Sequence, residues 1–213
     1  RGDATGQVAG LVRERRAQTP EVGVDVITFD ADGNVYNQHT TDGAGGFVGD
    51  YEPGAYTYRV TADGRFPTEP VPFEVREGAR TFLEIELPPP GAVSVRIARE
   101  DGRLMPGRCS LVAVHAATAT SVLGRDFLYD FALNERQRPR DLVPDDPARP
   151  ETRRYVEEVV FTASGQRTQR VRPGTYTAHC SRGLEYEVEV REVEVRPGEV
   201  TPIDVTLRRA IDT

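Results

Sequence analysis

The sequence contains an internal repeat, which limits the folds open to it. When the chain is shifted by 120 residues, residues 45–87 fall on residues 165–207 without a gap, and 12 of the 43 aligned positions are identical. The identities include Pro-Gly-x-Tyr-Thr, which begins at Pro53 and again at Pro173. They also include Glu-Val-Arg-x-Gly, which occurs twice at the same offset. A repeat of this length predicts two tandem copies of one folded unit.

The second copy carries extra residues. Gly6-x-Val8 falls on Gly91-x-Val93 at an offset of 85, which is 35 residues smaller than the offset found further along the chain. An insertion of that size is therefore expected between the matching segments, within residues 116–164. Its part at 134–154 is rich in Pro, Asp and Arg, whereas residues 127–133 are strongly apolar.

Short runs of alternating apolar and polar residues predict strands throughout. They are separated by turn signals such as Asp32-Gly33-Asn34, Asp63-Gly64 and Asp101-Gly102. No stretch of a dozen residues has the apolar spacing of a helix. The pattern is typical of an all-β sandwich or barrel. The expected strands include residues 22–29, 56–60, 82–87, 93–97, 110–114, 176–180 and 203–207.

Three consecutive prolines, Pro88 to Pro90, mark the break between the copies, because proline cannot donate to a sheet ladder and favours an extended spacer. We expect a first sandwich at 4–87, a linker at 88–90 and a second sandwich at 91–209. The insertion of the second sandwich is placed at about 116–164.

Composition excludes several kinds of chemistry. All 27 basic residues are arginine, so the chain offers no Schiff-base lysine, no P-loop lysine and no Lys–Asn isopeptide crosslink. The net charge of −7 argues against nucleic acid as the main partner. No run of about 18 apolar residues is present, so we expect no membrane span.

The first copy resembles a carboxypeptidase regulatory-like domain. The resemblance runs through Gly6-x-Val8-x-Gly10, Gly23-Val24-x-Val26, Thr41-Asp42-x-x-Gly45-x-Phe47, Pro53-Gly54-x-Tyr56 and Val75-x-x-Gly78. It implies a seven-stranded, transthyretin-like sandwich. The fold expected for the whole chain is therefore two tandem transthyretin-like or Ig-like β-sandwiches, the second with a long insertion.

The second copy resembles the region that precedes the catalytic domain of CehA/McbA-type metallohydrolases. The matching residues are Pro173-Gly174-Thr175-Tyr176, Ser181-Arg182-Gly183-x-Glu185-Tyr186-Glu187 and the final Leu207 to Thr213. The resemblance implies an extracytoplasmic bacterial protein whose residues 210–213 lead into a PHP-type, metal-dependent hydrolase domain. It also implies that Arg182, Glu185 and Tyr186 contact that domain, the partner within the same polypeptide. The alternative for residues 181–187 is a plain edge strand and turn.

The sequence predicts no catalysis, metal or cofactor in these 213 residues. The three histidines, His39, His115 and His179, are far apart, and no His-x-His, His-Glu-x-x-His or Cys-x-x-Cys motif occurs. Asp30-Ala31-Asp32-Gly33-Asn34 fails the EF-hand pattern at positions 6 and 12. We interpret it as a tight turn, with a weak surface calcium site as the alternative.

Two other functions stay open. One is an extracytoplasmic module that binds carbohydrate, cell wall or a protein, which ranks lower because there is no Trp and most Tyr and Phe fall at inward positions. The other is an architectural piece of a surface assembly, in which residues 127–133, with Phe127 and Phe131, form a buried interface. The residues alone do not choose between these functions.

The two cysteines are expected to face the core of the second sandwich. Cys180 falls on Val60 at the 120-residue shift, and Cys109 falls near Val24. Both valines belong to the inward set of the first copy. Buried free thiols and a Cys109–Cys180 disulfide are both compatible with this placement, and export to an oxidising compartment, as the resemblance implies, favours the bond.

Overall fold

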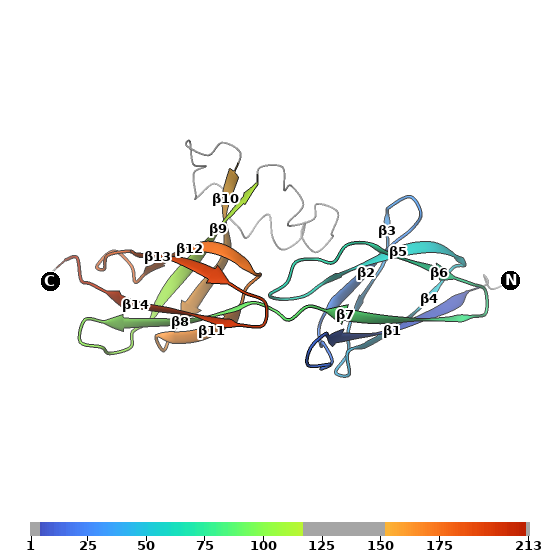
Figure 1. Cartoon of the computed structure of the whole chain (residues 1–213), viewed down its shortest axis with the longest axis horizontal. Coiled ribbons are helices and arrows are strands. Elements are labelled where there is room, and N and C mark those ends of the chain that lie inside the picture. Colours follow the sequence, from blue (N-terminus) through green and yellow to red (C-terminus); the bar gives the residue numbers. More distant parts are fainter. Residues whose placement is uncertain (1–4, 117–151, 212–213) are drawn as a thin grey trace. The chain divides into compact units, whose positions relative to one another are not determined.

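The computed structural model describes residues 5–116 and 152–211, with the backbone alone for 114–116 and 152–155. Within these residues every regular element is a β-strand (Figure 1). The chain divides into two compact units, Arg1–Pro89 and Pro90–Thr213. The described part has no helix of the length and hydrophobicity that a membrane crossing needs.

Unit 1 is a sandwich of seven strands. A three-stranded sheet has the order β4-β1-β7, and a four-stranded sheet has the order β3-β2-β5-β6. The strands are β1 (Gly6–Glu14), β2 (Asp25–Phe29), β3 (Val35–Thr40), β4 (Gly46–Tyr51), β5 (Gly54–Thr61), β6 (Val71–Val75) and β7 (Arg80–Leu87).

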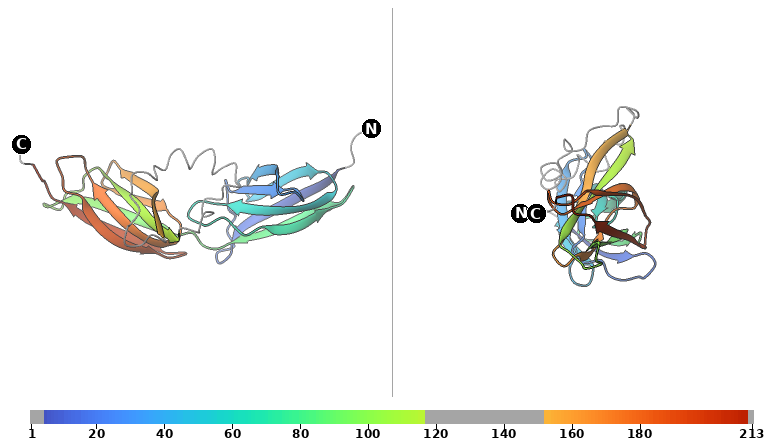
Figure 2. Two further views of the ribbon diagram at one scale, coloured as in Figure 1. Left: turned by 90° about the horizontal axis from the view of Figure 1, so that it is seen from above. Right: turned by 90° about the vertical axis from the view of Figure 1, so that its left-hand side faces the viewer.

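Unit 2 has the same topology. Its sheets have the orders β11-β8-β14 and β10-β9-β12-β13, which match those of unit 1 strand for strand. In Figure 2 each unit is seen as its own pair of sheets. The strands are β8 (Ala92–Arg99), β9 (Gly107–Ala116), β10 (Thr152–Thr162), β11 (Gln166–Arg170), β12 (Gly174–Ser181), β13 (Glu189–Val195) and β14 (Val200–Leu207).

The all-β prediction of two tandem sandwiches is therefore confirmed, and each expected strand overlaps an observed one. The expected bounds of the insertion need correction. Residues 152–162 form β10, which pairs with β9 as β3 pairs with β2. The extra residues of the second copy thus fall at 117–151, between β9 and β10, outside the described residues.

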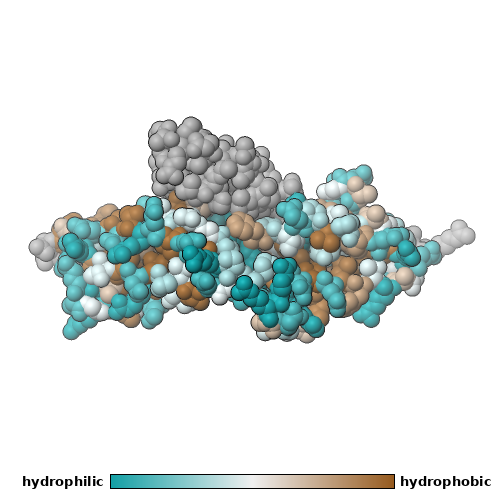
Figure 3. Space-filling view, in the orientation of Figure 1, coloured by the Kyte–Doolittle hydropathy of each residue, from teal (hydrophilic) through white to brown (hydrophobic). Residues whose placement is uncertain are grey.

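Each unit has its own apolar core between its two sheets. Alternation along the strands builds it, because successive side chains point to opposite faces. The core of unit 1 includes Val8, Val26, Tyr51, Val60 and Leu87. The core of unit 2 includes Val93, Cys109, Leu111, Cys180 and Leu207. On the face shown in Figure 3, the remaining apolar side chains are interspersed with polar ones.

The glycine that opens each first strand is required by close packing. A Cβ atom at Gly6 would lie 2.4 Å from the Arg76 carbonyl oxygen, and one at Gly91 would lie 2.4 Å from the Val171 carbonyl oxygen. No side chain fits at that distance from backbone. The Gly-x-Val shared by the two copies is thus explained by packing at the start of the sandwich.

Candidate functional site

The connection between β12 and β13 holds the three residues expected to act as anchors. The Arg182 guanidinium lies over the Tyr186 ring, 5.6 Å from its centroid. Tyr186 is partly buried and packs against the core of unit 2. A guanidinium over an aromatic face is an attractive arrangement. Arg182 and Tyr186 therefore close the core at the end of unit 2 where β14 ends.

The same connection holds the chain that leaves β14. The Ala210 N–H donates to the Glu185 carbonyl at 2.8 Å, and the Glu187 N–H donates to the Arg208 carbonyl at 2.9 Å. The carboxylate of Glu185 lies 3.6 Å from Arg209 Nη2. The structure thus brings Glu185 and Tyr186 against residues 208–210. Their partner here is the outgoing chain; contact with a further domain stays a prediction.

In unit 1 the connection between β5 and β6 also binds the outgoing chain, but through different residues. Arg65, which aligns with Glu185 at the 120-residue shift, donates through Nε to the carbonyl of Pro88, directly after β7. Its guanidinium also pairs with Glu21, and both side chains are nearly buried. The connection between the fifth and sixth strands therefore fastens the outgoing chain in both units. This correspondence is invisible in an alignment, because an Arg falls on a Glu.

Apolar side chains stand exposed around the outgoing chain of unit 2. Leu184 is 94% exposed, and Val188 and Ile211 are also largely exposed. At the positions 120 residues before Leu184 and Val188, unit 1 has Gly64 and Thr68. The end of unit 2 is therefore more apolar than its counterpart in unit 1.

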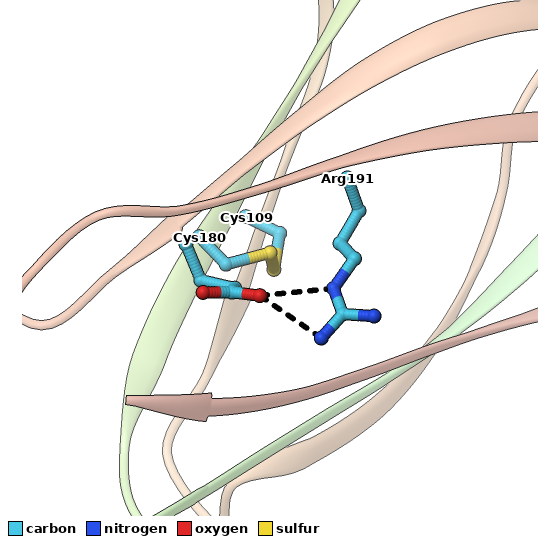
Figure 4. The surroundings of a disulfide bond; sticks show 4 residues. Cys109, Cys180 and Arg191 are labelled. Carbon is cyan, nitrogen blue, oxygen red and sulfur yellow. Dashed lines mark hydrogen bonds and ion pairs between the residues drawn. A yellow bond between two sulfur atoms is a disulfide. The ribbon is translucent and has the colours of Figure 1, made fainter. Parts of the chain in front are cut away.

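Cys109 and Cys180 form a disulfide between β9 and β12 (Figure 4). They are direct register partners, with their Cα atoms 4.0 Å apart, and both are fully buried. In unit 1 the same pair of positions is Val26 and Val60. Cys109 therefore aligns with Val26, and the expectation that it falls near Val24 was wrong by two residues because the turn before this strand differs in length.

A surface ion pair flanks the disulfide on β13. Glu189 is the register partner of Cys180, and Arg191 Nε donates to its carboxylate at 3.0 Å. Figure 4 shows the Arg191 side chain running beside the two sulfur atoms. Charged side chains on an edge strand discourage pairing with another sheet. The pair thus protects the open edge next to the disulfide.

The repeated Pro-Gly-x-Tyr motif forms a tyrosine corner in each unit. The Tyr56 hydroxyl donates to the Glu52 carbonyl at 3.0 Å, and the Tyr176 hydroxyl donates to the Arg172 carbonyl at 2.6 Å. Burial, together with Tyr36 and Glu52, raises the pKa of Tyr56 to about 12, so its hydroxyl keeps the proton that it donates. The motif therefore stabilises the turn before the fifth strand in each copy.

A β-bulge at the same place in both units aims one side chain across the sandwich. In unit 1 the extra residue is Tyr36, whose hydroxyl accepts the Glu52 N–H at 3.2 Å. In unit 2 it is Glu157, whose carboxylate accepts Arg172 Nε at 2.6 Å, with both side chains buried. Residues 52 and 172 are aligned positions. Bulges commonly redirect a side chain, and here both do so toward the same position.

His39 and His179, the two histidines whose side chains the structure describes, lie in different units. His39 Nε2 lies 2.8 Å from the Tyr51 hydroxyl, which lies 3.1 Å from Thr28 Oγ1. Burial lowers the pKa of His39 and raises the pKa of Tyr51. His179 lies in unit 2, opposite Ser110. Among the described residues, no three His, Cys, Asp or Glu side chains gather as metal ligands.

The acidic turn at residues 30–34 is built by its own first carboxylate. Asp30 Oδ1 accepts the N–H groups of Asp32 and Asn34 at 3.0 and 2.8 Å. Hydrogen bonding, chiefly from the Asn34 N–H, lowers the pKa of Asp30. The interpretation as a tight turn between β2 and β3 agrees with these contacts. At the weak calcium site considered as the alternative, Asp30 already accepts hydrogen bonds from backbone N–H groups.

Exposed aromatic residues are more numerous than the alternation predicted. Phe66, Phe82 and Phe161 are each about half exposed or more, and Tyr36 is also exposed. Tyr36 lies on β3, Phe66 between β5 and β6, Phe82 on β7 and Phe161 on β10, so no single strand gathers them. Phe127 and Phe131, the expected buried interface, lie outside the described residues.

No protein-family model matches the chain, and no curated protein is significantly similar to it in sequence. Among solved structures, it resembles a double mutant of the shaft pilin SpaA from Lactobacillus rhamnosus GG, with a TM-score of 0.51 and 11% identity over 99% of both chains. The minor pilin of Streptococcus agalactiae follows with a TM-score of 0.40 and 12% identity over 98% of both chains. The Bacillus anthracis TIE protein has a TM-score of 0.37 and 12% identity; the match covers 97% of this chain and 34% of that protein.

The likeness to SpaA is a likeness of fold. It supports two tandem β-sandwiches and gives no support to the expected relationship with carboxypeptidase regulatory-like domains or with PHP-type hydrolases. The family expectations therefore rest on sequence motifs alone.

Proposed function

We propose that this chain is a non-catalytic, extracytoplasmic pair of β-sandwiches that serves as an architectural piece of a bacterial surface assembly. The observation that carries the proposal is the extent of the structural likeness. Both units together match a shaft pilin over 99% of each chain. This favours the architectural function over the support of a hydrolase, which had been the primary expectation from the sequence.

The residues that the two copies share support a structural role. The Tyr of Pro-Gly-x-Tyr closes a corner, and the Thr that follows Glu-Val-Arg-x-Gly donates to a strand carbonyl in both units, from Thr81 to Glu74 and from Thr201 to Glu194. Gly78 and Gly198 occupy the left-handed backbone region at the same turn. Each of these repeated residues holds a turn or a strand in place.

The absence of lysine limits how copies could be joined. No amide bond through a lysine side chain is open to these 213 residues. Two copies of these 213 residues are therefore held together without a lysine amide bond in the proposal. Its disulfide is internal and leaves no other cysteine among the 213 residues.

The proposal is tested in the bacterium that encodes the chain. An antibody against the chain should label intact cells, and surface extracts should contain the chain in species larger than one polypeptide. An antibody against a cytoplasmic protein is the control for leakage. Labelling that requires cell lysis would contradict the proposal. So would a phosphodiesterase, esterase or amidase activity that copurifies with the chain.

One contact favours a second candidate, the accessory of a C-terminal hydrolase. The fastening of residues 208–210 by Glu185 and Glu187 fixes the direction in which the chain leaves unit 2, which suits a covalently attached domain. The coding sequence beyond Thr213 decides the matter. A His-x-His motif within a few dozen codons supports the hydrolase; its absence leaves the architectural function.

A further inference from the structure

In both units the first and last strands are parallel neighbours. β1 and β7 share eight register pairs, from Gln7↔Arg80 to Glu14↔Leu87. β8 and β14 also share eight, from Ala92↔Val200 to Arg99↔Leu207. The chain enters each unit at the start of the first strand and leaves at the end of the last (Figure 1). Entry and exit therefore lie at opposite ends of one ladder.

This geometry decides how a pulling force acts on the hydrogen bonds. Tension between entry and exit drives the two strands past each other along their length, so the evenly spaced bonds of the parallel ladder share the load. If entry and exit lay at the same end, tension would open the bonds one after another. A single backbone hydrogen bond contributes little net stability, so simultaneous loading is what makes a ladder strong against force.

We propose that each unit is a mechanical clamp that holds the chain under tension along its length. The source of the tension rests on the proposed function, a surface assembly. The resistance itself follows from the strand order. In this role the unit carries tension between whatever is attached to the two ends of the chain.

Further bonds fasten both ends of each ladder. At the entry of unit 1, the Gln7 N–H donates to the Ala79 carbonyl at 2.9 Å; at its exit, the Arg15 N–H donates to the Leu87 carbonyl at 2.8 Å. At the entry of unit 2, the Gly198 N–H donates to the Pro90 carbonyl at 2.8 Å. At its exit the chain is held by Glu185 and Glu187, as described above.

The disulfide does not bypass the clamp. It joins β9 to β12, and neither is the first or the last strand of unit 2. Force that enters through β8 must therefore break the β8–β14 ladder before it reaches the covalent bond. The ladders of the two units thus match in strand order and in the number of register pairs.

The test pulls unit 1 of the full chain in two directions at one loading rate. One handle is at the N-terminus. The other replaces either Pro89, which loads the β1–β7 ladder in shear, or the exposed Glu77, in the turn before β7, which peels it from one end. Circular dichroism and the urea midpoint of each handled protein verify that it is folded.

The unfolding force should be severalfold higher with the handle at residue 89 than at residue 77, because forced unfolding reports the barrier that the loaded contacts impose. Equal forces in the two directions would overturn the clamp. That outcome would leave a surface location untouched, whereas a chain found only inside cells would overturn the proposed function whatever the measured forces.

Discussion

Several residues of unit 1 have identical counterparts 120 positions later in unit 2. The role of such a residue can therefore be tested in each unit separately. Tyr56 and Tyr176 donate to carbonyls four residues upstream, in different units. Both side chains are more than 90% buried. In unit 2 the accepting carbonyl belongs to the buried Arg172, whereas in unit 1 it belongs to Glu52, which is exposed.

Replacing Tyr176 by phenylalanine should lower the free energy of unfolding by about 1–3 kcal/mol, because the carbonyl of the buried Arg172 loses its donor. Tyr56→Phe should cost less, because Glu52 is exposed and water can replace the hydroxyl. Tyr58→Phe is the control: Tyr58 is equally buried, and its hydroxyl makes no hydrogen bond to another described residue. Urea unfolding followed by circular dichroism measures all three. A loss from Tyr58→Phe as large as that from Tyr176→Phe would show that the hydrogen bond of the corner adds nothing to stability.

His39 gives unit 1 a dependence on pH. Burial lowers its pKa from the ordinary value of 6.5, so the unfolded chain binds the proton more readily than the folded one. Stability therefore falls as the pH drops below 6.5, until the folded histidine is protonated as well. His39→Gln, which keeps a polar group near Tyr51, should remove this part of the dependence.

The measurement compares the urea midpoints of the wild type and His39→Gln at pH 7 and pH 5.5. The carboxylates titrate in both proteins, so their contribution cancels in the comparison. The wild type should lose more stability than the variant. Parallel losses in the two proteins would mean that His39 titrates normally.

For the cysteines, the sequence could predict burial but not pairing. Alternation placed both of them in the core, and the structure agrees. The choice between thiols and a bond depended on the register between β9 and β12, which fixes Cys109 opposite Cys180. Register is set by the whole sheet and by the lengths of its turns, so two cysteines 71 positions apart could not reveal it.

Among the elements, the connection between the fifth and sixth strands has the least expected role. In unit 1 its Arg65 lies between the Glu21 carboxylate and the Pro88 carbonyl. Removing one member of a buried ion pair leaves an uncompensated charge in the protein. The connection is thus an anchor for the linker as well as a loop.

Arg65→Met should destabilise unit 1 by about 3–5 kcal/mol, since Glu21 would be buried without its partner. Arg76→Met is the matched control, because the ion pair of Arg76 with Glu74 is exposed and screened by solvent. It should leave the unfolding midpoint nearly unchanged. Similar effects of the two substitutions would show that the Arg65 pair does not stabilise the sandwich.

The strands themselves were predictable because their alternation survives in a sandwich with one solvated face. The contacts of the residues at the junction after β14 were only partly predictable. Tyr186 packs on its own core and Glu185 lies near Arg209, contacts that the sequence did not predict. Their expected contact with a further domain stays a prediction. The bulge residues Tyr36 and Glu157 were missed, because a bulge leaves no signal in the pattern of a single strand.

For the whole molecule, the two units share a topology and differ in one covalent bond. The disulfide of unit 2 closes a loop spanning 71 positions. That loop contains residues 117–151, so cutting the chain there should leave the pieces joined. With a specific protease site introduced in this segment, the cleaved protein should run as one covalent species on a non-reducing denaturing gel and as two after reduction. Two bands without reductant would show that the bond is absent.

The chain consists of two sandwiches of the same topology in tandem, and only the second is locked by a disulfide. Stretching the full chain by its termini tests this claim directly, because each unit should unfold in one step whose length reports the residues released. Between the first and last strands, unit 1 releases residues 6–87, whereas oxidised unit 2 releases only the residues outside the disulfide loop. One step should therefore be clearly shorter than the other.

Reduction should lengthen the shorter step by roughly 230–260 Å, at about 3.3–3.6 Å for each of the 71 locked positions, and make it the longer of the two. The other step should not change. Cys109→Val/Cys180→Val, with the residues that unit 1 has at the same positions, should give the reduced pattern without reductant. A single step for the whole chain, or two steps whose lengths ignore the reductant, would contradict the account.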